Sequence, residues 1–217
     1  MIIRKKYRVE MGHIVRNCSS KRCSHSMHGH SAVIEVLLEG KHLDKAGMLY
    51  DFGLMKGTVK QFIDMFDHCF VFWDKDDPDY IKDIQHWSDR WIALPFNPTA
   101  ELLSLFFMDA INFIISHTTM LNGEDKGLKC VGVIYHETES GYAQCCLKDL
   151  DTMWDSNNLF RFQLSDAVKE DISQDLALLI SRKSGLLITG TGARINPGCT
   201  PYKQVNANPT GQPNDWR

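Results

Sequence analysis

The sequence predicts an α+β domain in which two helices pack on one face of a four-stranded antiparallel sheet. Three observations predict it: an alternating stretch and an apolar stretch rich in branched residues near the N-terminus, two amphipathic stretches in the middle, and two further apolar stretches separated by a tight turn near residue 140. The predicted order is ββααββ. Helices that lie between two hairpins bury their apolar faces against the same side of one sheet.

The first two strands are predicted at Lys6 to Met11 and Ser31 to Glu39. The first stretch alternates loosely between apolar and polar residues and leads to His13. The second is rich in Val, Ile and Leu and ends at Gly40, as strands often do. Between them lies a polar loop, residues 16–27, which contains two cysteines.

Three histidines at the ends of these strands predict a metal site. His28 and His30 precede the second predicted strand, and side chains two residues apart in a strand point to the same face. These two imidazoles are therefore expected to bind one ion together, with His13 as the third ligand. Three imidazoles that leave a fourth position open are typical of a catalytic zinc (Zn2+) ion.

The two helices are predicted from apolar residues at helical spacing. The first begins near Asp51, which can cap it, and delivers Asp67 and His68 at its end. The second begins near Asn97-Pro98-Thr99, where proline is allowed in the first turn. The connection from Cys69 to Phe96 is long for a compact domain, and such a loop is usually functional or ordered by its own packing.

The last two strands are predicted at Lys129 to Glu137 and Tyr142 to Leu147, which would form a hairpin. Beyond residue 150 the character of the chain changes. We expect a C-terminal extension, residues 151–217, with one helix over 164–182 and then an irregular or disordered tail rich in Gly, Asn, Pro and Thr. Residues 1–150 would form the main domain.

Composition narrows the class of function. The chain has 217 residues, with 24 Lys and Arg against 27 Asp and Glu, a formal net charge of -3. This balance suggests no nucleic-acid and no membrane partner and favours a small-molecule substrate. The seven cysteines form no regular framework, the N-terminus lacks the apolar region of a signal peptide, and no stretch of 18 apolar residues occurs. We therefore expect a cytoplasmic protein.

Several short motifs, in their order and spacing, resemble the 6-pyruvoyltetrahydropterin synthase and 6-carboxytetrahydropterin synthase group over residues 1–150. The motifs are Glu10-Met11-Gly12-His13, the cysteine loop before His28-Gly29-His30, residues 47–52, Asp67-His68, residues 97–101, and Glu137-Thr138. The resemblance implies the tunnelling fold (T-fold), a homo-oligomeric barrel, tetramer or hexamer, with active sites between subunits. It also implies zinc on the three histidines and a dihydropterin triphosphate substrate.

The resemblance assigns proton transfer to a loop cysteine and to an Asp-His pair. Cys23 would remove a carbon-bound proton from the substrate, and a thiol beside a divalent cation and basic residues is expected to have a lowered pKa. Cys18 and Ser24 lie in the same loop and are rivals for this role. Asp67 and His68 would form a proton relay; without the resemblance, an imidazole at the end of a helix is better explained by binding free carbonyl groups.

The resemblance assigns substrate binding to Glu137, whose carboxylate would accept both the N3-H and the 2-amino group of the pterin ring, with a possible part in the relay. Glu139 is its rival if the register of the strand differs. Thr99 and Glu101 would contact the ring, although helix capping and first-turn charge explain them nearly as well. The basic residues of the cysteine loop, Arg16, Lys21 and Arg22, are candidates for the triphosphate.

The function implied is conversion of 7,8-dihydroneopterin triphosphate to 6-carboxy-5,6,7,8-tetrahydropterin with loss of acetaldehyde and triphosphate, on the route to 7-deazaguanines such as queuosine. Four residues separate Cys23 from His28, a spacing between those of the carboxy-forming and the mammalian pyruvoyl-forming enzymes. The alternatives are therefore a 6-pyruvoyltetrahydropterin synthase and an inactive pterin- or purine-binding protein on the same fold.

Overall fold

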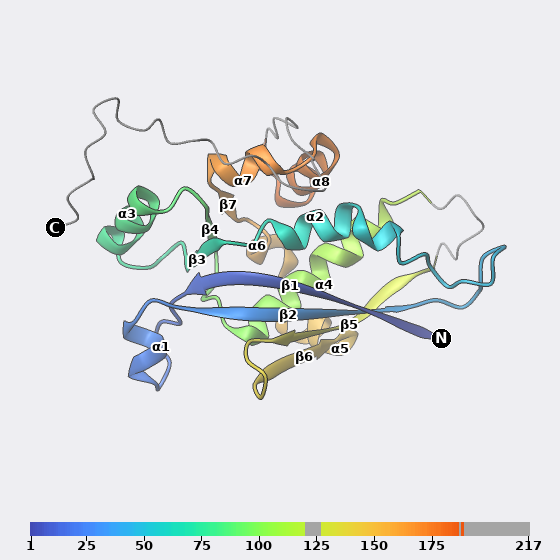
Figure 1. Cartoon of the computed structure of the whole chain (residues 1–217), viewed down its shortest axis with the longest axis horizontal. Helices are drawn as coiled ribbons and strands as arrows, with labels where there is room; N and C mark the ends of the chain where they lie inside the picture. The colour runs from blue at the N-terminus through green and yellow to red at the C-terminus, as the bar shows by residue number, and fades with distance from the viewer. Residues whose placement is uncertain (120–126, 187, 189–217) are drawn as a thin grey trace, which may run out of the picture.

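The computed structural model describes residues 1–119, 127–186 and 188, and its centre is a seven-stranded sheet in the order β6-β5-β2-β1-β3-β4-β7 (Figure 1). The strands are β1 (Ile2–His13), β2 (His28–Glu39), β3 (Cys69–Trp73), β4 (Trp91–Leu94), β5 (Lys129–His136), β6 (Tyr142–Cys146) and β7 (Gln163–Leu164). The helices are α1 (Lys21–His25), the 3-10 turn η1 (Leu54–Lys56), α2 (Thr58–Asp64), α3 (Pro78–Trp87), α4 (Ala100–Ser116), α5 (Leu147–Met153), α6 (Ser156–Leu159), α7 (Asp166–Asp171) and α8 (Gln174–Ser184).

Four of the strands form the predicted antiparallel sheet. β1 and β2 pair along their whole length, from Ile2 opposite Glu39 to His13 opposite His28. β5 pairs with β2 and β6 pairs with β5, both antiparallel. β1 and β2 are longer than predicted, so His28 and His30 lie inside β2 and not before it. The α+β class and the T-fold core are confirmed.

The sheet is mixed because the connection between the helices contributes two more strands. The segment predicted as a long loop, Cys69 to Phe96, contains β3, α3 and β4. β3 runs parallel to the end of β1 and parallel to β4. The described residues of the single chain form an open sheet and not a closed barrel. The four-stranded sheet of the prediction is thus only part of the sheet that forms.

The first predicted helix is interrupted. Asp51 does not cap it: its carboxylate accepts a hydrogen bond from the Gly53 N-H at 2.6 Å, the chain makes the short turn η1, and α2 begins only after Gly57. The helix α4 begins as predicted, with the Thr99 hydroxyl accepting from the Leu102 N-H at 3.3 Å. Both helices bury aromatic side chains in the common core, where the ring centroids of Phe62 and Phe106 are 5.7 Å apart.

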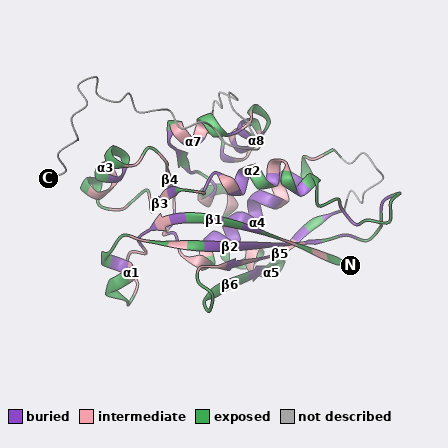
Figure 2. Cartoon of the chain, viewed as in Figure 1, coloured by how far each residue is buried: buried purple, intermediate pink, exposed green. Residues whose placement is uncertain are grey.

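The C-terminal extension packs into the same core. The range 164–182, predicted as one helix, contains the end of β7 and two helices, α7 and most of α8. It is divided because Ser165 and Ser173 each cap a new helix through the side-chain hydroxyl. Figure 2 shows buried positions on α8 as well as on α4. Buried side chains of the extension that join the core are Phe160, Phe162, Leu164, Val168, Ile172, Leu176, Ala177 and Ile180.

A buried carboxylate fastens the extension to α4. Asp109 is 9% exposed and accepts hydrogen bonds from the Trp154 indole at 2.9 Å, the Ser156 hydroxyl at 2.7 Å and the Lys183 ammonium at 2.7 Å. The tail predicted to be irregular, residues 189–217, lies outside the described residues. Within the described part of the chain, no helix has both the length and the apolar character that a membrane crossing requires.

Candidate metal centre

The hairpin of β1 and β2 brings the three predicted histidines together. His13 lies directly opposite His28 in the register, and His30 lies opposite Met11 on the same face as both. Each histidine offers one ring nitrogen to a group whose atoms all lie within 4.8 Å of one another. The ring centroids are 4.6, 5.1 and 5.1 Å apart. The three imidazoles therefore lie together, as the sequence predicts.

Backbone carbonyls fix the tautomers of two of these rings. The Nδ1 atom of His13 lies 2.9 Å from the Pro98 carbonyl, and the Nδ1 atom of His28 lies 2.9 Å from the Ser26 carbonyl. A carbonyl only accepts hydrogen bonds, so Nδ1 carries the proton in each ring and Nε2 keeps its lone pair. This arrangement is typical of histidines that bind metals through Nε2.

The free nitrogens fit a cation. The Nε2 atoms of His13 and His30 are buried and have no hydrogen-bond partner among the described residues. A buried acceptor without a donor destabilises the fold, and a metal ion would satisfy both nitrogens at once. The donor set and its orphaned nitrogens thus fit a metal that prefers imidazole ligands.

The pKa values of the histidines also favour metal binding. Burial, with further contributions from His28 and His30, lowers the pKa of His13 from 6.5 to about 4, against an opposing effect of the Pro98 carbonyl. Burial also lowers the pKa of His30, against the nearby Glu137 carboxylate. Both rings are therefore neutral at pH 7, which is the state that binds metal.

The metal-free protein is expected to lose stability as the pH falls from 6.5 to about 4, because unfolding exposes His13 and raises its pKa. In this range the unfolded chain binds more protons than the folded one, so the free energy of unfolding decreases as protons are added, by at most about 3 kcal/mol. Urea denaturation of chelator-treated protein at several pH values measures the slope.

The exposed His42 provides the control. A His42→Gln variant should keep the wild-type pH dependence, whereas His13→Gln should flatten it. The same slope in His13→Gln and in the wild type would show that the loss arises elsewhere.

The Glu137 carboxylate lies beside the histidine nitrogens. Its Oε1 atom is 3.4 Å from Nε2 of His13 and 3.7 Å from Nε2 of His30, and its side chain is 30% exposed. The backbone places it there, because the N-H groups of Glu137 and Thr138 both donate to the Gly141 carbonyl and close the hairpin after β5. The rival Glu139 lies exposed in the turn. Glu137 can therefore face a metal ion and an open surface together.

The Asp67-His68 pair lies in a turn and not at a helix end. The helix α2 ends at Asp64, so the free carbonyl groups of a helix end do not account for His68. The imidazole Nδ1 lies 3.0 Å from the Asp67 carboxylate, whose other oxygen accepts from the Glu10 N-H at 2.8 Å. This contact orients the ring and leaves Nε2 available for proton exchange.

An open groove of about 480 Å³ joins His68 to the metal histidines. Its lining residues are Glu10, Met11, Gly12, Met27, His28, Gly29, His30, Ser31, His68, Cys69, Phe70 and Ser88. Of the predicted catalytic groups, His68 thus shares one surface with two of the predicted metal ligands. Cys23, Thr99 and Glu101 are not among the described residues that line this groove.

Cys23 lies on the short helix α1, partly buried, and its carbonyl accepts from the Val15 N-H at 2.9 Å, which holds the loop against the end of β1. The two rival residues for the role of the base, Ser24 and Cys18, both make hydrogen bonds through their side chains. The Ser24 hydroxyl is buried and bound to the Ser20 carbonyl at 2.9 Å and to His25 at 2.8 Å. The Cys18 thiol faces the Ser20 carbonyl at 3.2 Å.

The Arg16 side chain already forms an ion pair within the chain, because its Nε atom donates to both carboxylate oxygens of Asp76, at 2.8 and 2.9 Å. Lys21 and Arg22 are exposed on α1. Of the three basic residues predicted for a triphosphate, the two on α1 are therefore better placed to meet an anion.

The start of α4 supports the metal centre through its backbone. Pro98 supplies the carbonyl that orients His13, and Thr99 next to it caps the helix. Glu101 is exposed in the first turn. Asn97 exchanges two hydrogen bonds with the backbone of Arg16, at 3.0 and 2.6 Å, and ties this start to the cysteine loop. Sequence reasoning found no signal for the roles of the Pro98 and Ser26 carbonyls, because any residue supplies a carbonyl.

Comparison with known proteins gives consistent results. The family model described as 6-pyruvoyl tetrahydropterin synthase matches residues 2–146. A protein of Helicobacter pylori strain J99 named 6-carboxy-5,6,7,8-tetrahydropterin synthase is 41% identical over 151 residues, which are 70% of this chain and 75% of that protein. A protein of the same name from Aquifex aeolicus is 33% identical over 123 residues, 55% of this chain and 73% of that one.

A solved structure has a similar fold. The crystal structure of an uncharacterized protein from Wolinella succinogenes aligns with a TM-score of 0.55 at 22% sequence identity, and the match covers 68% of this chain and 98% of that one. The three histidines, Cys23, the Asp67-His68 pair and Glu137 lie within the matched range, residues 2–146.

Proposed function

The chain belongs to the 6-pyruvoyl tetrahydropterin synthase family, and from that premise we propose that it is a zinc-dependent carbon-oxygen lyase. The proposed reaction converts 7,8-dihydroneopterin triphosphate and one water molecule to 6-carboxy-5,6,7,8-tetrahydropterin, acetaldehyde and triphosphate, for the synthesis of 7-deazaguanines such as queuosine precursors. The observation that carries the proposal is the cluster of His13, His28 and His30, in a chain that is 41% identical to a protein of that name. The Nε2 atoms of His13 and His30 in this cluster are buried and have no hydrogen-bond partner among the described residues.

The proposed metal is zinc, held by the three histidines, because three neutral imidazoles are a common ligand set of catalytic zinc. Bound zinc supplies Lewis acidity toward the side-chain oxygens of the substrate. The chain itself excludes competing protons from the site: the lowered pKa values of His13 and His30 keep these ligands neutral at working pH.

Proton transfer is assigned to Cys23, Asp67 and His68. The Cys23 thiolate removes a proton from the substrate side chain, and the His68 ring returns one through Nε2 while Asp67 holds its Nδ1. Because Cys23 does not line the groove that His68 shares with the metal histidines, we propose that the two come together between subunits of a homo-oligomer, a tetramer or hexamer. Light scattering in solution should then give four or six times 24.8 kDa.

The pterin ring is assigned to Glu137, with Thr99 and Glu101 as further contacts at the start of α4. In this proposal the Glu137 carboxylate accepts hydrogen bonds from N3-H and the 2-amino group. Its proximity to His13 and His30 supports a position of the ring next to the metal. The six described cysteines are free thiols, which supports a reducing compartment and hence the cytoplasm.

A Glu137→Gln variant is expected to raise the KM for the substrate about 10- to 100-fold, because a neutral amide loses one charge-assisted acceptor and opposes a ring N-H with its own NH₂. Steady-state kinetics of zinc-loaded protein measure the change. Glu139→Gln, two residues away in the exposed turn, is the matched control and should keep the wild-type KM. A rise in Glu139→Gln alone would transfer the ring contact to that residue.

Metal removal tests the function as a whole. Treatment with a chelator should abolish turnover of 7,8-dihydroneopterin triphosphate, and added zinc should restore it. Release of acetaldehyde in step with triphosphate supports the carboxy product. Triphosphate release without acetaldehyde would favour the second candidate, a 6-pyruvoyltetrahydropterin synthase, which the name of the matching family model supports. Binding without turnover in the zinc-loaded protein would instead indicate an inactive pterin-binding protein.

A further inference from the structure

The turn that carries the Asp67-His68 pair has a backbone conformation that needs support. His68 has a φ of 56°, in the left-handed region that non-glycine residues rarely adopt. Its side chain is 72% exposed, so packing of the ring does not hold it. The His68 N-H donates to the Glu10 carbonyl at 2.6 Å, which attaches the turn to β1 on one side.

Arg90 binds the same turn from the other side. Its Nε atom donates to the Asp67 carbonyl at 3.2 Å, and a second nitrogen lies 3.5 Å from the Met65 carbonyl. The Met65 carbonyl belongs to the C-cap residue of α2, and the Asp67 carbonyl lies in the turn that follows. The guanidinium is planar and has five donors, so one side chain can bind two carbonyls and still pair with a carboxylate.

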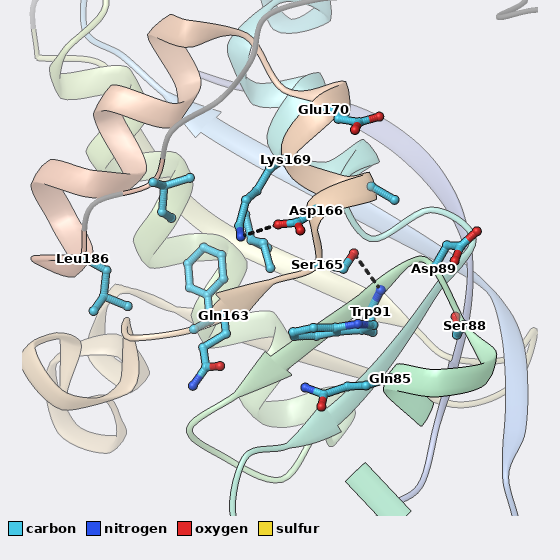
Figure 3. Close-up of a pocket in the computed structure, with 14 residues that line it drawn as sticks. Gln85, Ser88, Asp89, Trp91, Gln163, Ser165, Asp166, Lys169, Glu170 and Leu186 are labelled. Atoms are coloured by element: carbon cyan, nitrogen blue, oxygen red, sulfur yellow. Dashed lines mark hydrogen bonds and ion pairs between the residues drawn. The ribbon is translucent and has the colours of Figure 1, made fainter. Parts of the chain in front are cut away.

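The carboxylate comes from the C-terminal extension. The third nitrogen of Arg90 pairs with Asp171, the last residue of α7. The Ser165 N-H donates to the Trp91 carbonyl at 3.1 Å, and the Trp91 N-H donates to the Ser165 hydroxyl at 3.2 Å. Figure 3 shows the second of these bonds, between the Ser165 hydroxyl and the Trp91 nitrogen, at the pocket between α7 and β4. The extension is thus fixed to the residue next to Arg90.

We propose that Arg90 is a positioning residue for the Asp67-His68 turn and that Asp171 of the C-terminal extension holds Arg90 in place. The proposal rests on the proposed function, in which His68 transfers a proton. Neither Arg90 nor Asp171 is among the described residues that line the groove at the metal histidines. Their loss should therefore affect the rate of proton transfer more than the binding of substrate.

The competing explanation is an ordinary surface ion pair. The Arg90 side chain is 23% exposed and that of Asp171 is 50% exposed, and pairs with such exposure often contribute little to stability. The two explanations differ in their consequences. A surface pair predicts no change in catalysis, whereas a positioning residue predicts a fall in kcat.

The test compares variants on one helix, all in the full-length zinc-loaded protein. Asp171→Asn is expected to lower kcat about tenfold with little change in KM, because small displacements of a catalytic group are costly. Asp171→Glu should recover most of the loss. Asp166→Asn removes the pair with Lys169 on the same helix and should keep the wild-type kcat and KM. An unchanged kcat in Asp171→Asn overturns the proposal.

Amide hydrogen exchange separates this proposal from the proposed function. The His68 amide, bonded to the Glu10 carbonyl, should exchange about tenfold faster in Asp171→Asn than in Asp166→Asn. Equal exchange in the two variants overturns the proposal even if kcat falls. If the wild-type protein turns over no substrate, the proposed function fails, and the exchange comparison alone decides whether Asp171 holds the turn.

Discussion

Replacement of Cys23 by alanine is expected to lower kcat by a factor of about 10² to 10⁴, the range of a positioned acid or base, while the protein keeps its zinc. The reason is that alanine has no group to accept a proton, whereas the three histidines proposed to bind zinc lie on β1 and β2 and not on α1. Steady-state kinetics, with metal content measured on the same samples, test this expectation.

Cys18 is the matched control because it is a second, partly buried thiol in the same loop. Cys18→Ala should keep the wild-type kcat. A large loss in Cys18→Ala with full activity in Cys23→Ala would assign the base to Cys18. Full activity in both variants would remove the loop thiols from the reaction.

Replacement of His13 by alanine is expected to weaken zinc binding by more than about 100-fold, because loss of a direct ligand should exceed the loss caused by removing a group that only orients one. Turnover should disappear with the metal. Metal analysis after dialysis against a weak chelator measures the change. His42→Ala removes an exposed histidine and should retain zinc at the wild-type level.

His13 is buried, so its replacement also removes packing at the end of β1. His28→Ala provides a second variant at a less buried position of the same cluster and should lose zinc equally. Equal zinc in His42→Ala, His13→Ala and His28→Ala would show that the ion binds elsewhere.

The strands and helices with strong periodicity were predictable from the sequence. β2 carries an apolar stretch interrupted by Glu35, and α4 has apolar residues at helical spacing over 17 residues. The end of β2 and the start of α4 therefore lie where the sequence predicts them. The alternation of side chains in a strand also placed His28 and His30 on one face.

The segments that escaped prediction are short or depend on distant contacts. β3 has five residues and β4 has four, too few to show a period. Within the predicted first helix, the break at Gly57 divides one apolar pattern between η1 and α2. In the extension, Ser165 and Ser173 cap two separate helices, whereas the amphipathic pattern of the sequence predicts one.

The residues of the candidate site were predictable from the sequence, whereas the contacts that hold them in place were not. The histidines and Glu137 are recognised from their spacing and from the resemblance, and the hairpin register then brings them together. The left-handed backbone of His68 has no signal in the sequence, because it results from the turn after α2 and from contacts with β1 and Arg90. Arg90 and Asp171 are 81 residues apart and meet only in the folded chain.

The measurement that tests the central claim most directly is mass-spectrometric analysis of the pterin formed when zinc-loaded protein is incubated with 7,8-dihydroneopterin triphosphate. The account predicts 6-carboxy-5,6,7,8-tetrahydropterin with an equal amount of acetaldehyde, and neither product with Cys23→Ala. Substrate that is bound by the zinc-loaded wild-type protein and recovered unchanged would contradict it.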